Sequence, residues 1–507
     1  MQPIRKVLIA NRGEIAVRVI RTCREMGIVT VAVYSEADRG AMHVRAADEA
    51  YPVGPAPSSE SYLRSDRILD VAITAGCDAV HPGYGFLSEN ADFAEACAAS
   101  GIRFIGPTPE AIRAMGDKTH ARGLMEKAGV PMAPGTVDAV GDPDEALLIA
   151  RDIGFPVLIK AAAGGGGKGM RVVHEEDEFK RAMEAAGREA KAAFGDGRVF
   201  IEKFIQEPKH IEFQVLADMH GTCLHLFERE CTIQRRHQKV VEEAPGGTMT
   251  PQLREAMAEA AVQAARSCGY VGAGTVEFLL DADGSFYFME MNTRLQVEHP
   301  VTEWITGLDL VAEQIRVAEG RPLPFAQRDL NIHGHSVECR VYAENPSAGF
   351  LPDPGTLLVH RPPDGPGVRV DAGVEEGDAV QIHYDPMISK LTTWGVTREQ
   401  AIQRMVRAID EYEIAGVETT LGFCRFVMEH EAFRSGAFST RFVDRYFDAD
   451  SLDPAGDADL LAAFAAHAAA GGLGLQASGG APGSNGAASP NAGDLTPSRW
   501  VRRRDLN

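Results

Sequence analysis

The segment 286–300 carries polar side chains at every second position, the spacing of one face of an extended strand. These side chains are Glu290, Asn292, Arg294, Gln296 and Glu298. Carboxylates, an amide and a guanidinium on one face could hold a cation and an anionic substrate together. A solvent-facing strand surface gives the same alternation, so the preceding strand must decide between the two interpretations.

The preceding strand and this segment flank the sequence Asp-Ala-Asp-Gly, which is typical of a hairpin. A two-residue turn places Glu277 directly opposite Glu290, and a four-residue loop makes them diagonal neighbours, so they share a face in either register. Opposed like charges destabilise a sheet unless something neutralises them. Carboxylate and amide oxygens are ligands that Mg²⁺ prefers. We therefore predict a metal site at Glu277, Glu290 and Asn292, with Arg294 and Glu298 beside it for a second, anionic substrate.

A run of four glycines lies between a strand ending at Lys160 and the residues Lys168 to Met170. Glycine loops let backbone N–H groups converge on an anion. The spacing is not that of a Walker A loop, and a strand rather than a helix is expected at 171–173. This pattern favours a phosphate-covering hairpin, and a flexible surface loop is the alternative.

A basic cluster lies in the sequence CTIQRRHQKVVEEAP, which contains Gln234, Arg235, Arg236, His237 and Lys239. The chain as a whole is acidic, with 51 basic and 72 acidic residues and a net charge of −21. Global affinity for nucleic acid or an anionic membrane is therefore not expected. In such a protein a local basic cluster indicates an anion pocket, with a solvated basic patch as the alternative.

The elements that must position these groups form three parts of a 507-residue chain. Residues 1–115 alternate strands and helices, which predicts a doubly wound parallel sheet. Residues 116–333 continue as α/β, and residues 334–448 have shorter strands and one amphipathic helix, predicted at 398–415. Residues 449–507 are rich in Ala and Gly and are predicted to be a disordered tail.

The eight cysteines include no CxxC pair, so reduced thiols in a cytoplasmic protein are expected. The N-terminal apolar run is interrupted by charged residues and does not resemble a signal peptide. No apolar run is long enough to predict a transmembrane helix.

Several of these motifs closely resemble biotin carboxylase, a member of the ATP-grasp superfamily. They are NRGEIA, HPGYGFLSEN, GDK, KAAAGGGGKGM, QRRHQKVVEEAP, VEF and MEMNTRLQVEHPVTE, and the resemblance covers about residues 3–447. It implies a Rossmann-like N-terminal domain at 1–115, an ATP-grasp domain at 116–333 with a mobile lid at about 133–204, and a C-terminal α+β domain at 334–448.

The resemblance also implies roles for individual residues, position by position. ATP would be bound by Lys118, Lys160, Gly166, Gly167, Glu202, Lys203, Phe204, Ile205, His210, Gln234 and His237. The resemblance implies the same metal ligands as the hairpin argument, namely Glu277, Glu290 and Asn292. Bicarbonate would be bound by Lys239, Arg294 and the Val297 backbone, with Glu298 as the base that deprotonates it. Arg340 would stabilise the biotin enolate, and Tyr84 and Glu89 would border that site.

The implied reaction is ATP- and bicarbonate-dependent carboxylation of biotin through carboxyphosphate, with Mg²⁺ or Mn²⁺ as two ions. No Ala-Met-Lys-Met motif is present, so biotin is expected on a separate carrier protein, with carboxyltransferase subunits as further partners and a homodimer as the assembly. Acetyl-CoA, propionyl-CoA, longer acyl-CoA and pyruvate stay open as final acceptors. The alternatives are an ATP-grasp carboxylate–amine ligase and a non-catalytic nucleotide-binding regulatory subunit.

Overall fold

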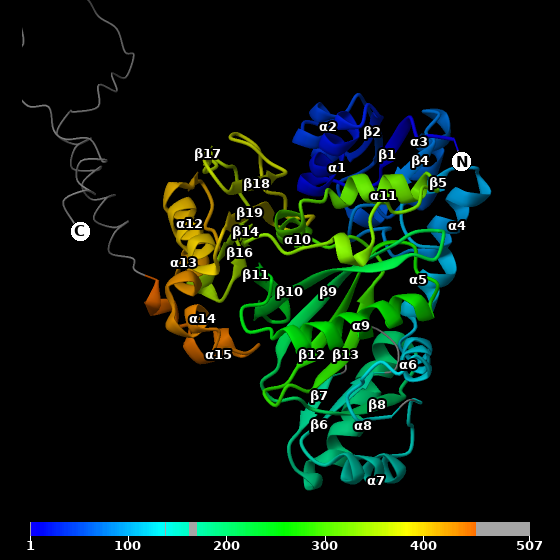
Figure 1. Ribbon diagram of the computed structural model, residues 1–507, viewed down its shortest axis with the longest axis vertical. Helices are drawn as coiled ribbons and strands as arrows, with labels where there is room; N and C mark the ends of the chain where they lie inside the picture. Colours follow the sequence, from blue (N-terminus) through cyan, green and yellow to red (C-terminus); the bar gives the residue numbers. More distant parts are fainter. Residues whose placement is uncertain (1, 137, 162–169, 453–507) are drawn as a thin grey trace, which may run out of the picture. The chain divides into compact units, whose positions relative to one another are not determined.

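The computed structural model describes residues 2–136, 138–161 and 170–452 (Figure 1). Residues 1–452 group into one unit and the remainder into a second. Residues 453–507 of the predicted tail and the glycine run with Gly166 and Gly167 lie outside the described residues, whereas Ala449–Ser451 form a short 3₁₀ helix.

The N-terminal part is a five-stranded parallel sheet with the order β3-β2-β1-β4-β5. Its elements are β1 (Lys6–Ile9), α1 (Gly13–Glu25), β2 (Val29–Ser35), α2 (Met42–Ala46), β3 (Glu49–Gly54), α3 (Ser65–Thr74), β4 (Ala79–His81), α4 (Ala91–Ala99) and β5 (Arg103–Phe104). Val7 and Ile9 of β1 pack in one core cluster with α1, whereas Leu8 packs in another with α3 and α4. Both faces of the sheet are therefore covered, as the apolar β1 sequence requires.

A second, three-stranded antiparallel sheet has the order β7-β6-β8. The elements of this region are α5 (Pro109–Gly116), α6 (Lys118–Lys127), α7 (Pro143–Ile153), β6 (Val157–Ala161), β7 (Arg171–Val173), α8 (Glu176–Phe194) and β8 (Val199–Lys203). The apolar side chains of β6 and β8 form one core with α7 and α8, and Val157, Ile159 and Phe179 are fully buried there. This small core holds Lys160 and Glu202 on neighbouring strands.

The largest sheet is antiparallel, with the order β13-β12-β9-β10-β11-β14-β19-β18 (Figure 1). The elements of this region are β9 (Lys209–Ala217), β10 (Cys223–Arg235), β11 (Gln238–Ala244), α9 (Pro251–Ser267), β12 (Gly272–Leu280), β13 (Phe286–Asn292), α10 (His299–Thr306), α11 (Leu310–Ala318), β14 (His335–Tyr342), β18 (Val368–Ala372) and β19 (Met387–Gly395). Strand β11 pairs with β14, so one sheet carries residues from both sides of position 334. Side chains far apart in sequence therefore share one face.

The remaining elements cover the far end of this sheet. They are β15 (Glu344–Asn345), β16 (Leu351–Pro352), β17 (Val359–Arg361), α12 (Arg398–Glu411), β20 (Glu413–Ala415), α13 (Leu421–Glu429), α14 (Glu431–Ser435) and α15 (Phe442–Tyr446). Helix α12 buries Ala401, Met405 and Ala408 at helical spacing.

The predicted mixture of a doubly wound N-terminal sheet with α/β and α+β regions is confirmed. The helix predicted at 398–415 instead ends at Glu411, because residues 413–415 pair with β17 as strand β20. No helix within the described ranges is long and apolar enough to cross a membrane.

Candidate active site

The hairpin of β12 and β13 places Glu277 directly opposite Glu290, which is one of the two predicted registers. A register shift between Glu277 and Phe278 separates this pairing from the pairing nearer the turn. Within the described residues, no donor contacts the Glu290 carboxylate. Desolvation of the carboxylate, followed by the negative charge of Glu277, raises the pKa of Glu290. This is the opposed carboxylate pair from which the metal site was predicted.

Strand β13 ends at Asn292, so the condition for one shared face, an extended chain as far as Glu298, is not met. The later polar groups nevertheless turn back toward the hairpin. Arg294 donates to Asn292 Oδ1 at 2.7 Å, and Gln296 donates to Glu277 Oε1 at 2.7 Å. The chain then enters α10, with Glu298 immediately before its first residue.

Lys239 lies at the centre of the site. Its Nζ lies 2.5 Å from Glu212 Oε2, 2.9 Å from Glu277 Oε1 and 2.7 Å from Glu298 Oε1. Burial alone would lower the pKa of Lys239, but the three carboxylates raise it well above its usual value. Lys239 is therefore a fixed positive charge.

His210 is buried beside Glu277. Its Nε2 lies 3.0 Å from Glu277 Oε2, and its Nδ1 lies 2.9 Å from the Gln234 amide nitrogen. Burial lowers the pKa of His210, but the Glu277 carboxylate outweighs this and raises the pKa to about 9. Three of the sequence-predicted residues thus share one hydrogen-bonded cluster.

Glu298 bridges two cations. One carboxylate oxygen accepts from Lys239, and the other accepts from Arg340 at 3.0 Å. The Arg340 Nε also donates to Glu242 at 2.6 Å. Burial would raise the pKa of Glu298, but these cations outweigh it and hold the pKa below its usual value. Glu298 is therefore ionised and lies 1% exposed between two charges that could hold an anion.

The residues predicted to border this site lie in the loop between β4 and α4 of the N-terminal part. Glu89 accepts from the Arg294 Nε at 2.9 Å and from the Thr293 backbone N–H at 3.0 Å. Tyr84 donates its hydroxyl to Glu14. The Arg294 segment is therefore anchored to the loop after β4 as well as to the hairpin.

The described residues predicted to contact the nucleotide lie on α6, on β6, on or just after β8, on β9 and β10, and in the β10–β11 turn. Lys160 pairs with Glu202 at 2.5 Å, and Glu202 is also paired with Arg122 at 2.5 Å. Lys118 opens α6, and burial followed by the charge of Lys160 lowers its pKa. Phe204 and Ile205 follow directly after β8.

Two other residues predicted to contact the nucleotide, Lys203 and His237, make no side-chain contact with the charged cluster within the described residues. Lys203 donates to the carbonyls of Gly154 and Phe155. His237 is exposed at the turn with φ +67°.

Comparisons with known proteins agree along most of the chain. Residues 3–112 match the model of the biotin carboxylase N-terminal domain, and residues 338–445 match the biotin carboxylase C-terminal domain. Residues 117–326 match the carbamoyl-phosphate synthase L chain ATP binding domain. A Nostoc protein named biotin carboxylase is 55% identical, and the alignment covers 86% of this chain and 98% of that protein. The chain belongs to the biotin carboxylase family.

A pyruvate carboxylase subunit from Methanothermobacter thermautotrophicus is 59% identical, over 87% of this chain and 90% of its own length. The chain spans only 60% and 64% of two methylcrotonoyl-CoA carboxylase alpha subunits, from Oryza sativa and Dictyostelium discoideum. The biotin carboxylase domain dimer of Hydrogenobacter thermophilus 2-oxoglutarate carboxylase, solved with MgADP, ADP and bicarbonate, superposes with a TM-score of 0.84. That structure is 49% identical and covers 88% of this chain and 98% of its own. The family and the ATP-dependent enzyme class predicted from the sequence are confirmed.

Three residues of this biotin carboxylase site were missed from the sequence. They are Glu212, Arg229 and Glu242. Arg229 is fully buried and donates to Glu212 at 2.5 Å and to Gln296 at 2.8 Å, so it orients the partners of Lys239 and Glu277. The alternation of His210, Glu212 and Gln214 on β9 was a usable signal, because it is the same period-two pattern as in the hairpin.

The divalent metal that this family implies fits the hairpin residues. Glu277, Glu290 and Asn292 offer hard oxygen atoms, and within the described residues the Glu290 carboxylate has no hydrogen bond or ion pair. Two other acidic clusters, His210–Glu212–Glu277 and Glu212–Cys231–Glu298, are close enough to hold an ion. Lys239 already occupies the space between their carboxylates, and burial raises the pKa of Cys231 and keeps it a thiol. The hairpin set is therefore the better metal site.

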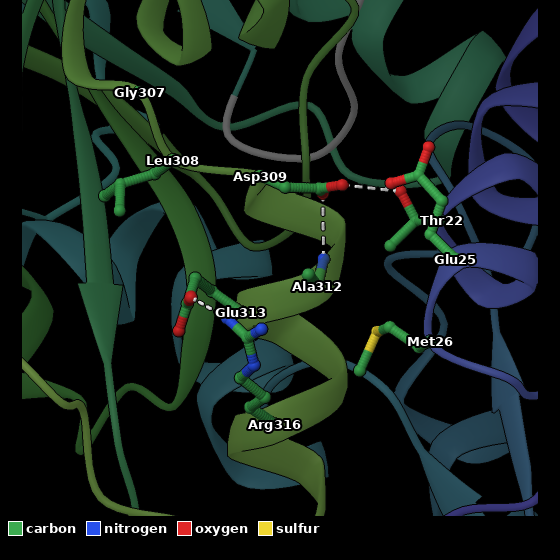
Figure 2. Close-up of a pocket in the computed structure, with 9 residues that line it drawn as sticks. All are labelled: Thr22, Glu25, Met26, Gly307, Leu308, Asp309, Ala312, Glu313 and Arg316. Atoms are coloured by element: carbon green, nitrogen blue, oxygen red, sulfur yellow. Dashed lines mark hydrogen bonds and ion pairs between the residues drawn. The ribbon is translucent and has the colours of Figure 1, made fainter.

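A separate pocket of about 410 Å³ lies between α1 and α11 (Figure 2). Asp309 caps α11 by accepting from the Ala312 N–H at 2.9 Å, and Thr22 donates to Asp309 at 2.7 Å. None of the predicted site residues lines this pocket.

Glu14 gives the biotin carboxylase fold a pH-dependent stability. Burial raises its pKa from 4.5 to about 7, against the opposing charge of Lys390. A carboxyl whose folded pKa is raised stabilises the fold below pH 4.5, and this contribution is lost as the pH rises through about 7. We expect Glu14→Gln to remove this loss, so that its stability relative to wild type improves by roughly 3 kcal/mol between pH 4.5 and pH 8.

Denaturant unfolding at several pH values measures this effect. Glu25→Gln, an exposed carboxylate on the same helix, is the matched control. A difference between Glu14→Gln and wild type that does not change with pH would contradict the assignment.

Proposed function

We propose that this chain catalyses the ATP- and bicarbonate-dependent carboxylation of biotin carried on a separate carrier protein. The observation that carries the proposal is the position of Glu298, an ionised carboxylate between Lys239 and Arg340. Two fixed cations around a buried carboxylate form a place where an anion can be held and deprotonated.

Bicarbonate would bind at Lys239, Arg294 and the Val297 backbone. The Arg294 guanidinium is already oriented by Glu89 and Asn292, so it needs little reorganisation to accept an anion. An arriving anion competes with Glu298 for Lys239 and Arg340. Glu298 then loses part of its charge compensation, its pKa rises, and it becomes a better acceptor for the bicarbonate proton.

The nucleotide would lie between the small sheet and the hairpin. Lys118 and Lys160 would hold its phosphates, and the β8 segment from Glu202 to Ile205 would contact the adenine. His210, Gln234 and His237 would complete the pocket, with Gly166 and Gly167 covering the phosphates. Mg²⁺ or Mn²⁺, held by Glu277, Glu290 and Asn292, would neutralise the transferring phosphoryl oxygens.

Bicarbonate oxygen would attack the γ-phosphorus of ATP and release ADP, giving carboxyphosphate. That intermediate would split into CO₂ and phosphate beside the biotin ureido group. The released phosphate would accept the ureido N–H proton, and the nitrogen would attack CO₂. Arg340 would stabilise the negative charge on the ureido oxygen during this step, and Tyr84 would border the ring. Arg340 cannot act as the base, because a guanidinium stays protonated.

We further propose a biotin carboxyl carrier protein and carboxyltransferase subunits as partners, with a homodimer as the assembly. The free state of all eight cysteines supports a reducing, cytoplasmic location. The relatives named above belong to carboxylases of pyruvate, methylcrotonoyl-CoA and 2-oxoglutarate, so the partner chain would set the acceptor.

The direct test measures ADP release by the purified chain with Mg·ATP, bicarbonate and free biotin. We expect ADP release to require bicarbonate and to be accompanied by ¹⁴C-carboxybiotin when labelled bicarbonate is used. Turnover that ignores biotin but responds to an amine would favour a carboxylate–amine ligase. Nucleotide binding without any turnover would favour a regulatory subunit.

A further inference from the structure

Lys390 is a fully buried lysine close to the site, and the mechanism above gives it no role. It lies on β19, directly opposite Arg340 of β14 and opposite Asp371 of β18, so the three side chains form a row on one face of the large sheet. Its exposed fraction is 0%. Burying an ammonium is costly, which calls for a specific set of partners.

The Lys390 Nζ donates to the Val297 carbonyl oxygen at 3.0 Å. It also lies 3.3 Å from Glu14 on α1 and 3.9 Å from Asp371. The ammonium therefore joins three separate segments: the N-terminal helix, the large sheet and the loop before α10.

Lys390 and Arg340 hold consecutive residues of that loop. Arg340 binds the Glu298 carboxylate, while its neighbour Lys390 binds the carbonyl of the preceding residue, Val297. A planar trans peptide sends its carbonyl and its N–H in opposite directions. Fixing the Val297 carbonyl toward the sheet therefore turns the following N–H, that of Glu298, away from the sheet.

We infer that Lys390 is a positioning residue for bicarbonate, which fixes the Val297–Glu298 peptide so that this backbone and the Glu298 carboxylate face the anion. This inference rests on the proposed function, because that proposal places bicarbonate at the Val297 backbone. Lys390 acts through Val297 and is not itself a ligand of bicarbonate or of the nucleotide.

The surroundings make Lys390→Met a usable test. Asp371 keeps Arg369 as a partner at 2.7 Å, so it does not lose all charge compensation. Glu14 can take up a proton, because burial already favours its neutral form. The double variant Lys390→Met/Glu14→Gln removes the second carboxylate altogether and guards against a folding defect.

Ser389→Ala is the matched control. Ser389 is the fully buried neighbour on the same strand, but its hydroxyl faces Tyr412 at 2.8 Å instead of the loop. Its loss removes one buried hydrogen bond without touching Val297.

We expect Lys390→Met to raise the KM for bicarbonate by about tenfold or more, the effect of one lost hydrogen bond from a charged donor. The KM for Mg·ATP should stay within about twofold of wild type, and Ser389→Ala should leave both constants unchanged. The measurement is bicarbonate-dependent ADP release with the full chain, with thermal unfolding to verify folding.

A folded Lys390→Met protein with the wild-type KM for bicarbonate would overturn the inference. Equal changes in the bicarbonate and nucleotide constants would do so too, since they indicate a general structural role. Failure of both Lys390 variants to fold would assign the lysine to stability and also reject the inference. If the unmodified chain shows no bicarbonate-dependent turnover, the proposed function fails instead.

Discussion

Glu298→Gln is expected to lower the rate of biotin carboxylation by about 10²–10⁴-fold, the usual contribution of a positioned general base. The substitution keeps the shape of the side chain but removes the group that would accept the bicarbonate proton. The fold should tolerate it, because Lys239 retains Glu212 and Glu277 and Arg340 retains Glu242. The measurement is steady-state formation of carboxybiotin at saturating Mg·ATP.

Two matched variants separate the base from other effects. Glu243→Gln changes another buried carboxylate of the large sheet, one paired with His335 and Arg398, and should lower stability without affecting turnover. Glu277→Gln should instead raise the Mg²⁺ requirement, because Glu277 belongs to the proposed metal set. If Glu298→Gln weakens Mg·ATP binding and spares turnover, Glu298 is part of the metal site and the base must be another group.

The hairpin shows what local sequence pattern can predict about this site. Alternation and the hairpin motif predicted that Glu277 and Glu290 share a face, and the two residues are paired. Neither predicted turn length is present, because Leu280 pairs with Phe286 and a register shift beside Glu277 restores the predicted pairing. The same alternation continues in the sequence beyond Asn292, although the strand ends there. What ends β13 there is tertiary contact: Glu89, 204 residues earlier in the chain, accepts from the backbone of Thr293.

The partners of Arg340 show why the rest of the site could not be derived from pattern alone. Glu242 is 98 residues away from Arg340 in sequence, and Lys390 lies on the next strand of the sheet. These contacts depend on the order β11-β14-β19, and neither periodicity nor spacing reports strand order. Arg340 was predicted as a site residue only from the motif resemblance. Every residue of its strand β14 is buried, so this strand has no alternation between exposed and buried faces that would single out Arg340.

Buried charge is balanced here by alternation of sign in space. Five charged side chains contact one another in sequence: Glu212, Lys239, Glu298, Arg340 and Glu242. Each of the three inner members therefore has a group of opposite charge on both sides. Removing such a row of charged side chains from water costs free energy, so a functional role for the charges is expected. An anion that enters it exchanges partners with Glu298 without leaving any cation unpaired.

Arg340→Ala is expected to separate ATP cleavage from carboxyl transfer. Biotin carboxylation should fall by about 10²–10³-fold, the loss that follows removal of one donor to a developing oxyanion. Nucleotide affinity should be preserved, because the contacts of Arg340 are Glu242, Glu298 and Tyr342 and none of the proposed phosphate ligands. Carboxybiotin formation and the Kd for Mg·ATP are measured on the same preparation.

Arg340→Lys is the informative partner variant, because it restores one charge without the planar fork that reaches Glu242 and Glu298 together. Partial recovery of carboxylation in Arg340→Lys, with the KM for biotin still raised, would assign the residue to charge stabilisation at the ureido oxygen. Equal losses of nucleotide affinity and carboxylation in Arg340→Ala would place the arginine in the ATP site and refute the biotin assignment.

The removal of a cation also raises the pKa of Glu298. The pH optimum of the residual activity should therefore shift upward in Arg340→Ala and by less in Arg340→Lys.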